Sequence, residues 1–232
     1  MFFSFFLWHI LAMIISHQCH FIVFFDPLGS HPWLQLALSP WADQHVSATH
    51  RPTRQSPFFV GMTPSEAKAA FTRQGLDFDS YTRIAVVQSP YSRLATLYDR
   101  MRDDSYQWRL TSRVRRNKVT FRDWLIDGQY ACHGPMSRLL PRWRRLGAMS
   151  TEQWAAGQID TFVRAEFAGS DMLAAMRKLG VVPALNFAAR QPHHRFGEML
   201  RYDSETLGII RERFQRDLRL YQGPATDLDL VA

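Results

Sequence analysis

Short runs of apolar residues predict the strands of this protein. Residues 21–25 (FIVFF) and 83–87 (RIAVV) are β-prone and almost free of polar side chains. A strand of a parallel sheet is covered on both faces, so it reads as a continuous apolar run rather than an alternating one. Residues 159–163 form a third strand candidate. We expect these three segments to be buried strands of one sheet.

Turn and helix signals follow the first two runs. Residues 26–30 (DPLGS) have turn chemistry, and Pro32 stands where a helix begins. In the second unit, Ser89 is placed to cap a helix that starts at Pro90, and one face of this helix is apolar. The apolar face consists of Leu94, Leu97, Tyr98 and Met101. Strands that alternate with helices predict an α/β fold whose parallel sheet is wrapped on both faces.

Other helix boundaries are marked by capping residues. Residues 63–66 (TPSE) match a capping box with proline at the first helical position, and Gly75 stands where that helix ends. Thr120 and Ser170 are predicted to cap two later helices, and a last helix is expected to end near residue 222. The segment 39–60 is rich in Ser, Pro, His and Arg and predicts a long loop.

The amino-terminal residues 1–15 (MFFSFFLWHILAMII) are strongly apolar. They are fewer than the roughly 20 apolar residues of a membrane-spanning helix, and they lack a basic start and a small-residue cleavage site. Three interpretations stay open: an interfacial anchor that contacts a membrane, a hydrophobic segment packed on the domain, or upstream sequence before a true start at Met13. We divide the chain into a leader (1–20), a single domain (21–222) and a carboxyl-terminal tail (223–232).

Composition narrows the class of protein. A chain of 232 residues is long enough for one sizeable core. Its net charge of +7 favours anionic partners without distinguishing a nucleotide from a nucleic acid or a membrane. Cys19 and Cys132 are too few for a disulfide framework and lack metal-site spacing, so we expect a cytosolic protein without a metal. The arginines at 109–118 and 138–145 alternate with apolar residues as in half-buried helices, so no nucleic-acid partner is expected.

The second strand-turn-helix unit carries a family resemblance. Residues 88–98 (QSPYSRLATLY) resemble the sulfotransferase phrase Arg-Asn-Pro-Tyr-Asp-Arg-Leu-Val-Ser-Leu-Tyr. In that family, the leading Arg and the later Ser bind the 3′-phosphate of 3′-phosphoadenylyl sulfate, the sulfuryl donor. Gln88 and Thr96 occupy these two positions here. The resemblance therefore implies a donor-binding junction with its arginine replaced.

Residues 24–32 resemble the family loop His-Ile-Pro-Lys-Thr-Ala-Gly-Thr-Ser, which cradles the 5′-phosphosulfate. The family's lysine falls at Pro27. Two later phrases also fit: residues 159–166 end in Arg-x-Glu, and Asn186 and Tyr202 match an Asn and a Tyr in the carboxyl-terminal part. The similarity covers residues 13–222. It implies a P-loop-like three-layer fold with a central parallel sheet flanked by helices and the donor at the sheet's carboxyl edge.

The resemblance implies a sulfotransferase that uses 3′-phosphoadenylyl sulfate to modify a hydroxyl of a carbohydrate or another small acceptor. Its implied donor-binding residues are Pro27, Leu28, Gly29, Ser30, Gln88, Ser89 and Thr96. His50 is the preferred catalytic base, because with Thr53 it resembles a His-x-x-Thr phrase of the family. His31, which lies in the donor turn itself, is the second catalytic candidate. The alternative is a degenerate relative that binds an anion or a partner without turnover.

Pro27 and Gln88, which replace the family's lysine and arginine, are expected to weaken both catalysis and donor binding. Loss of one oxyanion donor costs about 3–4 kcal/mol in a reaction barrier, and a hydrogen bond to a charged group is worth about 1.5–3 kcal/mol. The candidates to compensate for the lost positive charges are His31, Arg51, Arg54 and Arg93. Residues 193–195 (HHR) are candidates to contact the acceptor or a phosphate. The hypothesis requires that the two strand-turn-helix junctions lie side by side and aim their helical amino ends at one bisphosphate ligand.

Overall fold

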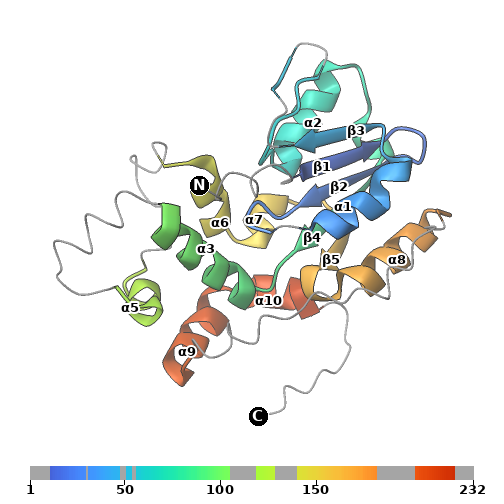
Figure 1. The fold of residues 1–232 in the computed structure, drawn as a ribbon. Coiled ribbons are helices and arrows are strands. Elements are labelled where there is room, and N and C mark those ends of the chain that lie inside the picture. Colours follow the sequence, from blue (N-terminus) through green and yellow to red (C-terminus); the bar gives the residue numbers. More distant parts are fainter. Residues whose placement is uncertain are drawn as a thin grey trace, which may run out of the picture.

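The computed structural model describes residues 11–29, 31–47, 51–53, 56–104, 119–128, 140–181 and 202–222. These residues form a mixed α/β fold in which helices cover both faces of a five-stranded sheet (Figure 1). The strand order is β3-β1-β2-β4-β5. The strands are β1 (Leu11–Ser16), β2 (Phe21–Phe25), β3 (Gln44–Ser47), β4 (Thr82–Val87) and β5 (Thr161–Arg164).

The sheet is mixed, which corrects the expectation of a purely parallel one. Strands β2, β4 and β5 are parallel, whereas β1 is antiparallel to both of its neighbours, β2 and β3. The reason lies in the connection between β1 and β2, which is only the turn 17–20. A parallel pair needs a crossover of a dozen or more residues, so a four-residue connection forces an antiparallel hairpin.

Strand β1 comes from the segment that the sequence assigned to a leader. Met13, Ile14 and Ile15 are at most 1% exposed, and β1 lies between β2 and β3. Residues 11–16 therefore belong to the sheet. Similarly, β3 lies inside the segment 39–60 that was predicted to be a loop.

Alternate side chains of each central strand enter two different cores. On one face, Ile22 and Phe24 pack beneath α2 (Pro64–Arg73), α6 (Arg142–Ala148) and α7 (Thr151–Ala155). On the other face, Val23 and Phe25 pack beneath α1 (Pro32–Leu38) and α8 (Ala168–Lys178). Both sets are completely or almost completely buried. A strand buried on two faces explains why the sequence of β2 is uniformly apolar.

A third cluster lies beside the sheet and is built mainly from helices, together with Leu28 of the β2 turn and Val119. Its apolar residues come mainly from α3 (Pro90–Asp104), α5 (Phe121–Ile126) and α9 (Ser204–Arg213), around the fully buried Trp124. The helix α10 (Gln215–Gln222) follows α9 directly, so the single last helix expected from the sequence is divided at Phe214. Three short 3-10 helices complete the described elements: η2 (Ser39–Trp41), η3 (Phe78–Ser80) and η5 (Ala165–Phe167).

Most of the predicted helix caps are confirmed. The Thr63 side chain accepts a hydrogen bond from Glu66 N in a complete capping box, and Thr120 accepts one from Asp123 N. The predicted cap at Ser170 is wrong. Helix α8 begins at Ala168 as a continuation of η5, so Ser170 lies inside its first turn and donates to the Phe167 carbonyl. In the part of the chain that the structure describes, no helix is long and apolar enough to span a bilayer.

Candidate functional site

The carboxyl ends of β2, β4 and β5 lie at one edge of the sheet, because these three strands are parallel neighbours (Figure 1). Phe25 pairs with Val86, and Asp26 N donates to the Val86 carbonyl at 3.1 Å. The turn after β2 and the turn after β4 are therefore adjacent. A Cβ atom placed on Gly29 would lie 3.3 Å from Nε2 of Gln88. The two junctions required by the sequence hypothesis thus meet.

Two backbone N–H groups of the turn after β2 are hydrogen-bonded to Asp26 of the same turn. The buried Asp26 carboxylate accepts a hydrogen bond from Leu28 N at 2.7 Å, and Gly29 N donates to the Asp26 carbonyl at 3.0 Å. Pro32, the first residue of α1, has no N–H group to offer. The described residues of this turn therefore do not form the expected P-loop-like cradle, in which free N–H groups face an anion. Ser30 lies outside the described residues.

His31 is packed into the same turn. Its side chain is buried and stacks on Phe25, with ring centroids 6.5 Å apart. Its Nε2 has no hydrogen-bond partner among the described residues and lies 2.8 Å from the position of a Cβ on Gly29, so a side chain larger than hydrogen at residue 29 would collide with the ring. Burial lowers the pKa of His31, although the carboxylates of Asp26 and Glu166 oppose the shift.

The lowered pKa of His31 predicts that acid destabilises the protein. An unfolded histidine has a pKa of about 6.5, so below that pH the unfolded chain binds a proton that folded His31 resists. Stability is then lost as the pH falls from about 6.5 toward the lowered folded value. We expect His31→Phe to flatten this part of the stability–pH curve, measured by urea denaturation at a series of pH values. Equal slopes for the wild type and the variant would contradict the assignment.

The turn after β4 is held by Glu166. Ser89 Oγ accepts from Ser92 N at 3.1 Å, which is the cap expected for α3. Ser89 N donates to Glu166 Oε1 at 3.2 Å, and Ser92 Oγ donates to the same oxygen at 2.9 Å. The Tyr221 hydroxyl donates to the other carboxylate oxygen. Burial, followed by the negative charge of Glu166, raises the pKa of Tyr221 strongly. An internal carboxylate therefore occupies the amino end of α3.

Gln88 and Thr96 differ in their surroundings. Oε1 of Gln88 is buried beside the Gly29 turn and has no hydrogen-bond partner in the part of the chain that the structure describes. Thr96 Oγ1 donates to the Ser92 carbonyl at 2.8 Å, as a hydroxyl on a helix surface commonly does. Gln88 thus remains available to a neighbouring group, whereas the hydroxyl hydrogen of Thr96 is used within α3.

The described arginines near this edge have partners. The buried Arg93 binds Asp217 at 2.7 Å and the Thr151 hydroxyl at 2.8 Å, so it does not swing toward the β2 turn as a compensating cation. Arg164 forms a two-pronged ion pair with Asp171. These ion pairs neutralise arginines at the edge of the sheet that would otherwise attract an anionic ligand.

Arg100 was not identified from the sequence, although it reaches the β2 turn. Its guanidinium donates to the Pro27 carbonyl at 3.3 Å and lies over the ring of Trp143, 4.5 Å from the centroid. It thus brings a positive charge close to the position at which the resembled family has a lysine. Its spacing of seven residues beyond Arg93 places it two turns farther along α3, and only the tertiary fold brings it to the turn.

The remaining candidates are exposed, are paired elsewhere or lie outside the described residues. Arg51 and Thr53 are exposed. The candidates His50, Arg54, Asn186, His193, His194 and Arg195 lie outside the described residues, together with the arginines of segment 109–118. Arg142 of the second arginine cluster donates to the Gly61 carbonyl and pairs with Glu66. Among the described residues, no group of three or more His, Cys, Asp or Glu side chains could hold a metal ion.

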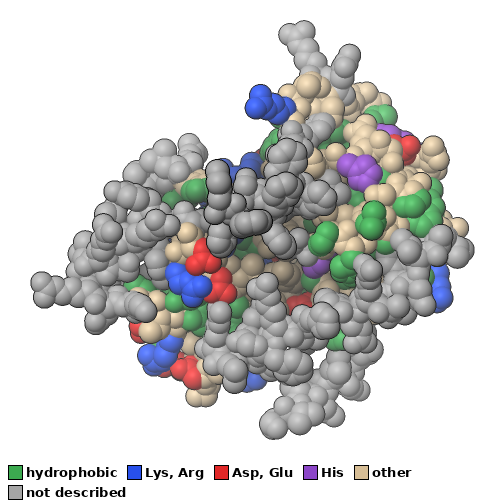
Figure 2. Space-filling view, in the orientation of Figure 1, with side chains coloured by type: hydrophobic (Ala, Val, Ile, Leu, Met, Phe, Trp, Pro, Cys, Tyr) green, Lys and Arg blue, Asp and Glu red, His purple; other side chains and the backbone are tan. Residues whose placement is uncertain are grey.

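Charges of both signs are mixed among the described residues on the face seen in Figure 2. Figure 2 shows blue and red side chains of the described residues beside one another rather than one broad basic patch on the face in view. Several of the exposed basic residues are in ion pairs, such as Arg122 with Glu205 and Lys68 with Asp79.

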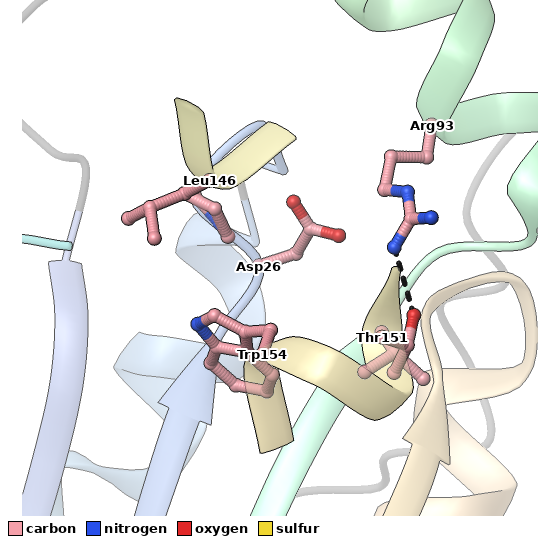
Figure 3. A pocket seen from close by; sticks show the side chains of 7 residues that line it. Asp26, Arg93, Leu146, Thr151 and Trp154 are labelled. Carbon is pink, nitrogen blue, oxygen red and sulfur yellow. Dashed lines mark hydrogen bonds between the residues drawn. The ribbon is translucent and has the colours of Figure 1, made fainter. Parts of the chain in front are cut away.

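A small cavity lies beneath the β2 turn, on the side of α6 and α7. Its lining residues are Asp26, Pro27, Val87, Arg93, Leu146, Thr151 and Trp154 (Figure 3). Its volume is about 10 Å³, which suits a single water molecule and not a nucleotide. Comparison with protein-family models, curated proteins and solved structures found no significant match to this chain.

Proposed function

We propose that this protein has a sulfotransferase-like scaffold whose donor site is closed by its own side chains, and that it acts as a binding module without sulfuryl transfer. The observation that carries the proposal is the hydrogen bond from Leu28 N to the Asp26 carboxylate. In a donor-binding loop, the N–H groups of this turn would face the phosphosulfate. Here an internal anion takes one of them.

Charge strengthens this argument. A phosphosulfate placed at the turn would meet the Asp26 carboxylate, while the position of the family's lysine holds the uncharged Pro27. Each hydrogen bond to a charged group is worth about 1.5–3 kcal/mol, so the loss of one such contact weakens binding about 10- to 100-fold. The replacement of the 3′-phosphate arginine by Gln88 adds a second loss of similar size. Together they favour a scaffold without effective donor binding.

The junction after β4 contributes less to the proposal. Glu166 occupies the amino end of α3, where an anion would otherwise be favoured. However, the Arg-x-Glu ending is itself part of the family resemblance, so a glutamate at this position is compatible with donor binding. Asp26, which stands where the family has proline, is the feature that distinguishes this chain.

Sulfuryl transfer to a hydroxyl of a carbohydrate or small acceptor is the second candidate function. One specific observation favours it: the Arg100 guanidinium lies at the Pro27 carbonyl and brings a cation near the lysine position. In that case Arg100 would stabilise the charge of the leaving phosphate, and His31, buried in the same turn, would be the nearest described histidine to act as a base.

Calorimetry with 3′-phosphoadenosine 5′-phosphate, the desulfated donor, separates the two functions. We expect no binding heat and no shift in Tm at millimolar ligand, with adenosine monophosphate as the control. A response to the bisphosphate and not to the monophosphate would reject the closed-site proposal. If that response disappeared in Arg100→Ala, the second candidate would be supported.

A further inference from the structure

We infer that the cavity beneath the β2 turn holds one buried water molecule, which joins the Asp26 carboxylate to the Arg93 guanidinium. This inference rests on the lining and size of the cavity and is independent of whether a donor nucleotide binds. It assigns Asp26 a second role, in addition to its bond with Leu28 N. That role is to fasten the β2 turn to the junction of α3, α7 and α10.

The cavity has the size and polarity that a water molecule requires. A cavity needs roughly 10–15 Å³ of accessible space to hold one water, and this one has about 10 Å³. Apolar cavities stay empty, but here a carboxylate, a guanidinium and a hydroxyl all belong to the lining: Asp26, Arg93 and Thr151. Figure 3 shows the Asp26 carboxylate directed across the cavity toward the side on which Arg93 and Thr151 lie.

The three polar groups can each make a bond to the same water. Asp26 Oδ1 accepts from Leu28 N, which leaves Oδ2 as an acceptor. Arg93 uses one N–H of its Nη1 for the Thr151 hydroxyl and its Nη2 for Asp217, which leaves a second hydrogen on Nη1. The Thr151 hydroxyl accepts from Arg93 and keeps its own hydrogen to donate. Buried waters typically make about three hydrogen bonds, as this arrangement provides.

The water changes how the buried charges are compensated. Asp26, Arg93 and Asp217 are all less than 8% exposed, and Arg93 is directly paired with Asp217. Burial of a second carboxylate is costly unless a hydrogen-bond donor reaches it. A bridging water is nearly as good as a direct hydrogen bond, so it extends the Asp217–Arg93 pair to Asp26. The β2 turn is thereby connected to α10 through the water, Arg93 and Asp217.

A double-mutant cycle tests the bridge. Asp26→Asn keeps the oxygen that binds Leu28 N but removes the acceptor on the cavity side, and Thr151→Val removes the hydroxyl. Because both groups bind one water, we expect their effects on the unfolding equilibrium to be non-additive by at least about threefold. The control cycle pairs Thr151→Val with Asp171→Asn, whose carboxylate binds Arg164, and is expected to be additive. Additivity in the first cycle would overturn the inference.

A cavity-filling variant gives a second, opposite test. Val87 lines the cavity, so Val87→Ile places an extra methyl group in its space. If the cavity holds the bridging water, the methyl group expels it and leaves buried polar groups unpaired, so unfolding becomes more favourable by about fivefold or more. If the cavity is dry, the added methyl group fills it and stabilises the protein. Stabilisation of Val87→Ile would therefore also overturn the inference.

Discussion

A chain that begins at Phe21 is expected to lose cooperative folding. It lacks β1, whose Met13, Ile14 and Ile15 are buried in the two cores on opposite faces of the sheet. Burial of each such side chain contributes about 1.5–3 kcal/mol, so the three together approach the whole stability of a typical domain, about 5–15 kcal/mol. The strand also lies between β2 and β3 and joins β3 to the rest of the described sheet, because it forms an antiparallel ladder with each of them.

A chain that begins at Leu11 is the matched control, because it keeps all of β1. Thermal unfolding followed by circular dichroism distinguishes the two. We expect a cooperative transition for the chain from Leu11 and none for the chain from Phe21. If the shorter chain unfolded cooperatively at the same temperature, residues 11–16 would be dispensable for folding, which would contradict this account of β1.

Asp217→Ala is expected to lower the free energy of unfolding by about 3–5 kcal/mol. The substitution leaves the Arg93 guanidinium charged and buried without its carboxylate, and loss of one member of a buried pair has an effect of this size. It also removes the acceptor for the N–H groups of Thr151 and Glu152, at 2.8 and 3.2 Å, which begin α7. Urea denaturation at neutral pH measures the difference.

Glu152→Ala is the control for Asp217→Ala. Glu152 pairs with Arg216 on the surface, where the two side chains are 48% and 77% exposed. Exposed pairs contribute no more than about 1 kcal/mol, because water and side-chain entropy offset the attraction. An Asp217→Ala variant that lost no more stability than Glu152→Ala would show that the buried pair does not hold α3, α7 and α10 together.

The part of the fold that was predictable has strong local signals. The uniformly apolar runs identified β2 and β4, and the Thr63 capping box and the Thr120 cap identified the starts of α2 and α5. In these segments, local preference and tertiary burial agree, so the sequence pattern is sufficient.

The strands that were missed lack such signals. The connection 17–20 between β1 and β2 has no Gly, Asn or Pro, and its His20 adopts a positive φ of 49°, which is uncommon for residues other than glycine. Without a turn signal, the apolar run before it read as a leader. Strand β3 (Gln44–Ser47) is a short edge strand with one buried residue, Val46, so its sequence shows almost no pattern.

The adjacency of the two turns was predictable from the sequence, but the side chains that bind their polar groups were not. Two turns that follow parallel strands must lie at one edge, so the adjacency of Gly29 and Gln88 followed from the order of the elements. The hydrogen-bond partners of the residues in those turns could not be inferred from that order. Ser89 binds Glu166, 77 residues away, and Arg93 binds Asp217, 124 residues away, and such contacts exist only in the folded chain.

Restoring the family's residues should open the site. The variant Asp26→Ala/Pro27→Lys/Gln88→Arg frees the Leu28 N–H group and places cations where the resembled sulfotransferases have them. With two charge-assisted contacts regained, we expect the affinity for 3′-phosphoadenosine 5′-phosphate to rise at least about 100-fold above that of the wild type.

The control variant has the same charge change at the opposite end of the sheet: Asp79→Ala/Gln18→Lys/Ser80→Arg, all at exposed positions. The decisive measurement is a calorimetric titration of the bisphosphate into the wild type and both variants. Binding by the restored variant alone is the predicted result. Micromolar binding by the wild type, or equal binding by the two variants, would contradict a donor site closed by Asp26.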